Sequence, residues 1–484
     1  MQQVKLSPED SSVIQGRYGN EESFFRILDA LLKGGHFTPL TQACSVNHGI
    51  VQLSIEEQNQ FVQLFEEQKK DYELASFVPA SGAASRMFQD LREGNENAAE
   101  YKRFSDHHTL FPFINAWREQ VKEWPSNQPL PFRFLDETLL SQGLQLAMKP
   151  KGSVPFHQYE NEIRTAFQEH VHEAIHFLEG RTGVHIHFTV ASNFSVNDRN
   201  SLRSYAMEIG ARRGKVVTVS FSHQYPNTDV PALTEEGEPL RDEHGNIVFR
   251  PGGHGSLLSN LNQLYADLVF IKNIDNVVRE GKNELVFFTR KMLGGYLMNL
   301  LHQRNKLISA LRKGDEEASL EAQKFVLKHF GFEPEVPEVF EVLNRPLRVC
   351  GMVRNEGEPG GGPFWVRNKE GRTTVQIVEK AQIDCNDAEQ QKILDESTYF
   401  NPVDIVCSFR NEEGEVYDLS AFADNDLAFV TNKKHNGKTI RVYEHPGLWN
   451  GSMAGWNSVF VEISKEVFAP VKTVNDLLRP AHQK

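Results

Sequence analysis

The sequence contains few cysteines. Four are spread over 484 residues, and no two of them form a CxxC pair. This number and spacing exclude a disulfide framework and a cysteine-rich zinc site. They favour reduced thiols, as in a cytoplasmic protein. The four are Cys44, Cys350, Cys385 and Cys407.

Long apolar runs and an excess of positive charge are also missing. No run approaches the ~20 residues of a membrane-spanning helix, and the N-terminal MQQVKLSPEDSS has no apolar signal core. The chain has 52 Lys and Arg against 65 Asp and Glu, a net charge of −13. This balance argues against general binding to nucleic acid or a membrane surface, although it permits a local basic pocket. We expect a soluble cytoplasmic protein that binds neither nucleic acid nor a membrane. The sequence does not indicate the oligomeric state.

The remaining composition is that of a globular protein, with 39% hydrophobic and 24% charged residues. A chain of 484 residues can form two or three lobes. Apolar residues at helical spacing predict an N-terminal helical lobe over residues 1–74. Residues 89–148 are rich in aromatic residues and predict a helical insertion with a proline-marked loop.

Strands and helices alternate after residue 184. Apolar, β-branched segments predict strands at 185–190, 216–221 and 268–271, with a helix at 199–209 between the first two. This alternation predicts an α/β layer with a largely parallel sheet. After two more helices, strands dominate. We therefore predict a core domain at 75–345 and a last domain at 346–484, with strands at 347–353, 364–366, 374–378, 405–409, 440–443 and 458–463.

The segment FVPASGAASR at 77–86 is a candidate ligand loop. An apolar strand meets five small residues, and Arg86 then opens a helical pattern. This order exposes backbone N–H groups at a helix N-terminus, where phosphate binds well. Small side chains let the backbone approach an anion, and the guanidinium fork of Arg86 suits phosphate oxygens. A tight strand-to-helix turn without a ligand has the same pattern.

Two further loops suit a nucleotide. KPKGSVPF at 149–156 holds Lys151 between proline and glycine, as a point charge for a phosphate. RPGGHGS at 250–256 again places small residues before a predicted helix. A solvated Lys-Pro-Lys turn is the alternative for the first loop.

IDNV at 274–277 follows the predicted strand at 268–271. Ligands of open α/β sheets bind beyond the carboxyl ends of strands. Asp275 is therefore placed to bind Mg²⁺, which takes one or two carboxylates together with substrate phosphates. The alternative is an Asp-Asn turn whose side chains cap the backbone.

HEAIH at 172–176 is a competing signal on a predicted helix at 163–178. His172 and His176 are four residues apart on one helix face and could bind Zn²⁺, with Glu173 as general base. No glycine-then-histidine extension follows at the metzincin spacing. A zinc hydrolase is thus one alternative function.

Together the motifs resemble those of the eukaryotic-type UDP-sugar pyrophosphorylases, the UDP-N-acetylglucosamine and UDP-glucose enzymes. The similarity runs in order from residue 77 to 478. Four segments resemble the phosphate-side motifs of these enzymes. Residues 80–86 resemble A-G-G-x-G-T-R and 150–155 resemble P-K-G-x-x-P. Residues 274–276 resemble V-D-N and 468–473 resemble F-x-P-V-K-T. On the base side, the stretch that begins at 224 resembles Q-x-x-x-P-A-L and the one that begins at 251 resembles P-x-G-N-G-G-L. On the sugar side, the stretch that begins at 378 resembles V-E-Y-S-E-I and the one that begins at 401 resembles N-A-G-N-I.

A closer resemblance is to the DUF4301 family of bacterial proteins, a label that carries no activity. Its motifs P-A-S-G-A-A-S-R-M and P-K-G-x-x-P-F-H occur here at 79–87 and 150–157. Ser81 and Ala84 stand where the pyrophosphorylases have glycines. His254 stands where they have asparagine.

The resemblance implies a GT-A-like nucleotidyltransferase fold: a Rossmann-like, mostly parallel central sheet flanked by helices, with an N-terminal helical lobe and a C-terminal extension. It implies transfer of a nucleotide from a nucleoside triphosphate, UTP, to a sugar 1-phosphate, with Mg²⁺ as cofactor and pyrophosphate as second product. The implied residues are Arg86, Lys151 and Lys472 for catalysis, Ser81, Gly82, Ala83, Gln224, Gly253, His254 and Gly255 for the nucleotide, Glu379 and Asn401 for the sugar, and Asp275 for the metal.

Two more alternatives stay open beside the zinc hydrolase. A GT-A glycosyltransferase would use a ready-made nucleotide-sugar and release nucleoside diphosphate. A nucleotide-sugar-binding protein would turn nothing over, and Ser81 and Ala84 favour it because they narrow the phosphate loop.

Overall fold

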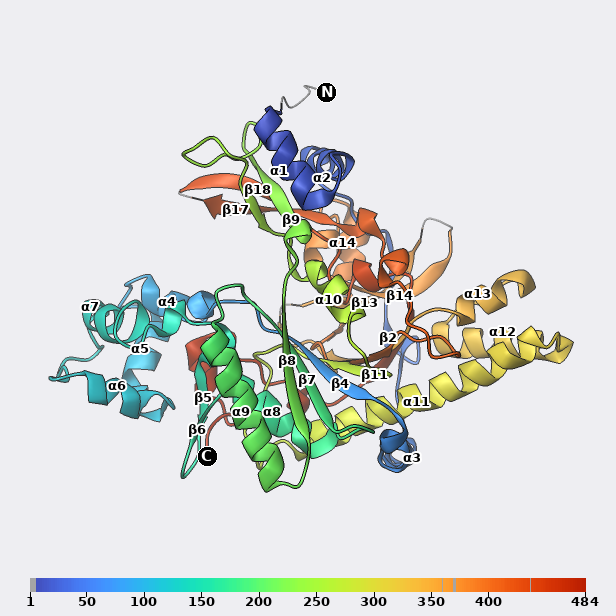
Figure 1. The fold of residues 1–484 in the computed structure, drawn as a ribbon, viewed down its shortest axis with the longest axis horizontal. Coiled ribbons are helices and arrows are strands. Elements are labelled where there is room, and N and C mark those ends of the chain that lie inside the picture. The colour runs from blue at the N-terminus through green and yellow to red at the C-terminus, as the bar shows by residue number, and fades with distance from the viewer. Residues whose placement is uncertain (1–5, 359, 369–370, 436) are drawn as a thin grey trace. The chain divides into compact units, whose positions relative to one another are not determined.

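The computed structural model describes residues 6–358, 360–368, 371–435 and 437–484 (Figure 1). The chain forms two compact units, each assembled from separate segments. The first unit comprises Met1–Gln60, Gln224–Asp267 and Gly295–Ile463, and the second comprises Phe61–His223, Leu268–Gly294 and Ser464–Lys484. The sequence predicted consecutive domains instead. Consecutive domains differ from these units because strands far apart in sequence pair within one unit; Val51, for example, lies opposite Val461.

The second unit is built on a parallel sheet in the order β11-β4-β7-β8. Its strands are β4 Leu74–Pro79, β7 Val184–Val190, β8 Val217–His223 and β11 Leu268–Ile271. The central strands are almost entirely buried, as expected when helices cover a parallel sheet. The helices α8 Ala166–Phe177 and α9 Val196–Arg212 pack against β7 and β8.

The rest of the second unit is largely helical. The predicted helical insertion at 89–148 is confirmed as helical and contains α4 Gln89–Arg92, α5 Ala99–Asp106, α6 Ile114–Gln120 and α7 Phe132–Leu135. Its aromatic side chains form a core of stacked and edge-on rings, including Phe104, Phe111 and Trp117. A small antiparallel pair follows, with β5 Pro155–Gln158 and β6 Ile163–Thr165.

The first unit contains the sheet segment β2-β3-β19-β12-β16. The pairings are parallel except that β16 and the short β15 run antiparallel to β12. The strands are β2 Ser45–Val46, β3 Gly49–Val51, β12 Leu347–Arg354, β15 Tyr399–Phe400, β16 Ile405–Ser408 and β19 Asn457–Glu462.

Two antiparallel sheets complete the first unit. The order β10-β9-β18-β17 joins β9 Asp229–Thr234, β10 Phe249–Pro251, β17 Phe429–His435 and β18 Lys438–Glu444. The helices α1 Pro8–Tyr18 and α2 Glu22–Lys33 share a buried apolar cluster with this sheet. The order β1-β13-β14 joins β1 Leu40–Ala43, β13 Gly362–Arg367 and β14 Thr373–Val378.

Further helices of the first unit are α10 Leu258–Asn262, α12 Glu316–Phe330, α13 Val339–Leu343 and α14 Ala388–Asp395. The helices α3 Ile55–Gln68 and α11 Glu284–Arg312 contain residues of both units. Among the described residues, every helix is too short or too polar to cross a membrane.

The fold is mixed α/β, and the predicted strands after residue 184 are confirmed with ends that differ by one or two residues. The prediction of helices throughout 1–74 is wrong for β1, β2 and β3. β1 and β3 pair with the distant strands β13 and β19, which no local pattern shows, and β2 pairs with β3. The helix predicted from residue 163 begins at Ala166 instead. Thr165 caps it, with its side chain accepting from the Gln168 N–H.

Candidate active site

Three loops of the second unit converge on Asp275. The Oδ2 atom of Asp275 accepts hydrogen bonds from Lys151 Nζ at 2.7 Å and from Lys472 Nζ at 3.1 Å. These residues are far apart in sequence and come from the loop after Met148, the loop after β11 and the segment near the C-terminus. The predicted residues Lys151, Lys472 and Asp275 therefore form one ion-paired cluster, which we call the lysine pair with Asp275.

Backbone contacts fix the loops that carry this cluster. The Val471 N–H donates to the Asp275 carbonyl at 3.0 Å, and the Ala469 N–H donates to Asn276 Oδ1 at 3.1 Å. The N–H groups of Lys472 and Thr473 both donate to Asp476 Oδ2. Lys472 is thus held at a capped turn rather than on a loose tail.

Burial and charge act against each other at the cluster. Burial raises the pKa of Asp275, but the two lysines outweigh it and hold the pKa below its usual value. Burial lowers the pKa of Lys151, and Asp275 opposes this effect. Asp275 Oδ1 is buried and has no hydrogen-bond partner among the described residues. The Lys472 side chain is 50% exposed, so the cluster offers one accessible cation and one unused carboxylate oxygen.

The predicted phosphate loop lies against the Lys151 loop. The Lys151 N–H donates to the Gly82 carbonyl at 3.0 Å, and the Ala84 N–H donates to the Lys149 carbonyl at 2.9 Å. Ser81, Gly82 and Ala83 are exposed, and their N–H groups donate to no backbone carbonyl in the described part of the chain. Arg86 is exposed as well.

The helix expected after this loop is much shorter than predicted. A 3₁₀ turn at Ala84–Arg86 is followed by the four-residue helix α4. Such short helices contribute little dipole, so any anion binding at 81–86 relies on exposed N–H groups and on Arg86.

The other predicted residues lie in the first unit, where His254 is the centre of a second cluster. The Leu448 N–H donates to His254 Nδ1 at 2.9 Å, which leaves the proton of the neutral ring on Nε2. Nε2 lies 3.4 Å from Glu379 Oε1. The imidazole stacks on Trp449, with ring centroids 4.2 Å apart. Asn450 Nδ2 donates to Glu379 Oε1 at 2.9 Å.

Glu379 is ionised and well positioned. Burial raises its pKa, but hydrogen bonds from His254 and Asn450 together lower the pKa below its usual value. Its backbone and Gln382 form a capping box at the end of β14. The Glu379 side chain keeps 29% exposure, so it can still accept a hydrogen bond from a ligand.

The glycines beside His254 are required by close packing. Gly253 has φ +79°, a conformation that L side chains rarely adopt. A Cβ on Gly255 would lie 2.1 Å from the Pro446 carbonyl oxygen. The loop therefore lies directly on the 445–450 segment that carries Trp449 and Asn450.

Two predicted residues have other roles in the structure. Asn401 is buried, and its amide donates to the Gly351 carbonyl and accepts from the Val403 N–H. This arrangement ties backbone together, so we leave Asn401 out of the site. Gln224 lies at the start of the first unit's middle segment, with its Nε2 donating to Asp229 Oδ1 at 3.3 Å.

The HEAIH segment does not form a zinc site. Glu173 is buried and ion-paired with Lys272 at 2.8 Å and with Arg290 at 3.2 Å, so it is no free base. His172 and His176 both face Glu280, which also binds Arg164 and Arg213. Glu280 is thus already bonded to two guanidinium groups, and no group of three or more His, Cys, Asp and Glu side chains that could hold a metal ion occurs among the described residues.

Sequence reasoning missed Trp449, Asn450 and Asp476. Trp449 and Asn450 lie in the segment HPGLWNG, whose Pro-Gly pair marks a loop. Asp476 lies three residues after Thr473, the spacing of a capping box. Only the contacts show which loops these residues serve.

Comparison with solved structures shows a shared fold. The uridine diphosphate N-acetylglucosamine pyrophosphorylase from Trypanosoma brucei, solved with an inhibitor, superposes with a TM-score of 0.51 at 14% identity, over 98% of this chain and 79% of that one. A UDP-glucose phosphorylase from Trypanosoma brucei gives 0.44 at 14% identity over 97% and 76% of the two chains. A UDP-glucose pyrophosphorylase variant from Leishmania major, solved with UDP-glucose, gives 0.43 at 12% over 98% and 79%.

A comparison with curated protein sequences gave no match. The family model described as a domain of unknown function, DUF4301, matches residues 7–483. This match spans nearly the whole sequence, and the predicted resemblance to the family is confirmed. The chain belongs to the DUF4301 family.

Proposed function

We propose that this protein is a nucleotidyltransferase that joins a sugar 1-phosphate to a nucleoside triphosphate, UTP, and releases pyrophosphate. The observation that carries the proposal is the lysine pair with Asp275, held by three loops of one unit. The fold shared with the Trypanosoma brucei pyrophosphorylase supports it. We extend the proposal to a GT-A-like arrangement of the core.

The chemistry needs charge stabilisation more than covalent help. An oxygen of the sugar phosphate attacks the α-phosphorus, a new P–O bond forms, and the bond to the β-phosphate oxygen breaks as pyrophosphate leaves. The nucleophile is already an anion, so the enzyme must neutralise charge and align the reactants. Lys151 and Lys472 would stabilise negative charge near the α-phosphate, and Arg86 with the N–H groups of Ser81, Gly82 and Ala83 would bind the leaving phosphates.

Asp275 has one carboxylate oxygen that is available to a magnesium ion. Its Oδ1 atom is buried without a partner, while Oδ2 is shared by the two lysines. Mg²⁺ accepts one carboxylate oxygen when phosphates and water complete its shell. When bound, the ion would neutralise phosphate charge. The lysines would then keep Asp275 oriented toward it.

The His254 cluster of the first unit, taken by itself, has groups that suit a nucleobase and a sugar. The His254 ring, stacked on the buried Trp449 and 27% exposed, would offer a flat surface to a base, and Gly253 and Gly255 allow close approach of the backbone. Glu379 would accept a hydrogen bond from a sugar hydroxyl. In this proposal His254 takes the position at which the pyrophosphorylases have asparagine.

The test is pyrophosphate release from a panel of nucleoside triphosphates and sugar 1-phosphates, with Mg²⁺ and then with EDTA. The Lys151→Ala and Lys472→Ala variants should each lose at least ~10²-fold in kcat, the scale for one charge-stabilising group. Lys70→Ala is the matched control, because Lys70 is a half-exposed lysine of the same unit whose ion pair among the described residues is with Glu179. It should retain wild-type turnover.

The other functions give different results in the same assay. Release of nucleoside diphosphate from a nucleotide-sugar would identify a glycosyltransferase, and nucleotide-sugar binding without turnover would identify a binding protein. Unchanged kcat in either the Lys151 or the Lys472 variant would remove that lysine from the mechanism.

A further inference from the structure

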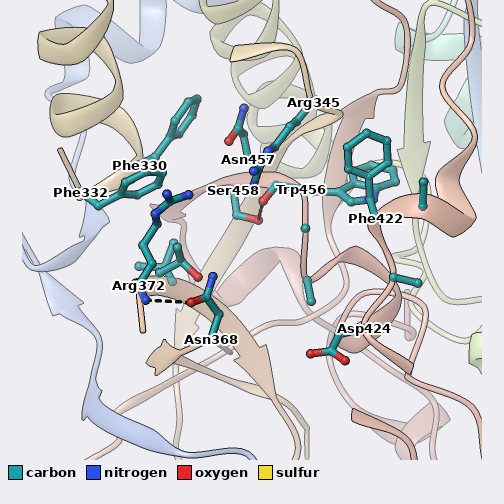
Figure 2. Close-up of a pocket in the computed structure, with 16 residues that line it drawn as sticks. Phe330, Phe332, Arg345, Asn368, Arg372, Phe422, Asp424, Trp456, Asn457 and Ser458 are labelled. Atoms are coloured by element: carbon teal, nitrogen blue, oxygen red, sulfur yellow. Dashed lines mark hydrogen bonds between the residues drawn. The ribbon is translucent and has the colours of Figure 1, made fainter. Parts of the chain in front are cut away.

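A cavity of about 390 Å³ lies in the first unit, and no residue of the His254 cluster lines it (Figure 2). Ligand pockets begin at about 300 Å³, so this volume admits a small organic molecule. Figure 2 shows Phe330 and Phe332 on one side, Phe422 and Trp456 on the other, and Ser458 between them. The walls are therefore aromatic and the middle is polar.

The cavity is distinct from the site proposed for the nucleotide-sugar. Thr374 at the start of β14 lines it, whereas Glu379 follows the end of the same strand. Five residues of extended chain separate the two by roughly 17 Å. Asn457 and Ser458 likewise lie at the amino end of β19. A ligand in this cavity would not overlap one at Glu379.

A buried, unpaired charge lies behind Ser458. Arg348 is fully buried, and its Nε donates to Ser458 Oγ at 2.8 Å while its Nη1 donates to the Trp449 carbonyl at 2.6 Å. Among the described residues, its Nη2 has no hydrogen-bond partner and no carboxylate acts on its charge. A buried charge without a counter-charge is costly, so an anion beside Ser458 would be stabilised.

Other charged residues around the cavity leave the balance positive. Arg345 and Asp424 both line it, with opposite charges. Arg372 also lines it and pairs with Glu338 at 2.6 Å. With these charges balanced, the excess positive charge is that of Arg348. The Ser458 hydroxyl contacts the Trp456 carbonyl only at 3.5 Å, so it can turn to donate to an anion.

Trp456 supplies a second observation that indicates a ligand. Its side chain is 4% exposed, and its indole N–H has no acceptor among the described residues. A buried N–H is nearly always hydrogen-bonded in a folded protein. A bound molecule with an acceptor oxygen would satisfy this donor, and the neighbouring phenylalanine rings would cover a flat apolar group.

We propose that this cavity binds a small organic anion that carries a flat ring, of the aryl phosphate or aryl carboxylate class. The anion would lie near Ser458, in front of Arg348. The ring would lie between the aromatic walls. The inference does not depend on the function proposed above, since none of these residues belongs to that site.

Titration with phenyl phosphate by calorimetry tests the inference, using the full chain with Lys472→Ala to weaken the other phosphate site. We expect binding at least 10-fold tighter than that of inorganic phosphate or phenol alone, since each probe lacks one half of the recognition. Trp456→Phe removes the unpaired N–H and keeps a ring, and should weaken binding about 5- to 10-fold. Ser458→Ala should weaken it to a similar extent.

Trp365→Phe is the matched control, because its indole N–H already donates to His48 at 3.0 Å, outside the cavity. It should bind phenyl phosphate as the parent does. Ala454→Phe, which fills the cavity, should abolish binding and covers the case in which Trp456→Phe does not fold. Absence of phenyl phosphate binding, or equal affinity in all four variants, would overturn the proposal.

Discussion

At the residue scale, Glu173 lies in a motif typical of catalytic sites, but its contacts in the structure are those of a residue that stabilises the fold. Both of its carboxylate oxygens accept from the buried Lys272 Nζ, at 2.9 and 2.8 Å, and Arg290 lies at 3.2 Å. Burial raises the pKa of Glu173, but the two cations outweigh it and lower the pKa to about 2. The carboxylate is therefore charged at neutral pH.

Removing this charge should destabilise the fold. We expect Glu173→Gln to lower the free energy of unfolding by about 3 kcal/mol, because two buried cations lose their shared carboxylate. Urea unfolding at pH 7 measures this loss. The control is Glu179→Gln, where a partly exposed carboxylate pairs with Lys70 and Lys215 and the loss should stay near ~0.5 kcal/mol. Equal losses in both variants would contradict the role assigned to Glu173.

At the element scale, the Lys151 loop and the neighbouring 81–86 loop differ in how tightly they pack. A Cβ on Gly152 would lie 2.5 Å from the ring of Phe167, a buried residue of α8. A Cβ on Gly82 would meet nothing within 4 Å. The Lys151 loop is thus packed against α8, whereas the 81–86 loop borders open space.

Alanine substitutions should separate these two loops. Gly152→Ala is expected to lower the free energy of unfolding by about 1–3 kcal/mol, because the extra methyl group overpacks a full core. Gly82→Ala should change it by no more than about 0.5 kcal/mol. Thermal unfolding of both variants gives the comparison, and a stable Gly152→Ala protein would show that Phe167 can move aside.

At the scale of the whole molecule, several histidines are buried in their neutral form. Burial lowers the pKa of His170, His172, His187 and His329 to about 4, and burial with the neighbouring His157 lowers that of His482 to about 3. In the unfolded chain each would titrate near 6.5. Between these values the unfolded state binds more protons than the folded state.

Stability should therefore fall as the pH falls from 6.5 toward 4. Each histidine contributes up to ~1.4 kcal/mol per pH unit in this range, above the range where most carboxylates titrate. Urea unfolding at pH 7, 6 and 5 measures the slope. His187→Gln keeps a polar group that can bond Ser220 and Ser222. It should reduce the slope of the unfolding free energy against pH by the contribution of about one bound proton. A flat profile between pH 7 and 5 would contradict the neutral burial of these residues.

The sequence alone determined much of the local structure and part of the site. Period-two and apolar runs identified β7, β8, β11, β12 and β19, because local side-chain alternation reflects burial in a sheet. The order of the motifs also selected Lys151, Asp275 and Lys472, which the fold brings together. Their roles in binding nucleotide and metal stay predictions.

Only the tertiary structure decided which segments share a unit and which polar groups remain available. β1 and β3 have little local signal, since β13 and β19, with which they pair, lie hundreds of residues away. Asn401 and Glu173 carry suitable chemistry in sequence, but buried partners occupy both side chains. The sequence did not indicate the stacking of Trp449 on His254 or the burial of Arg348. Both depend on packing between segments that are far apart in sequence.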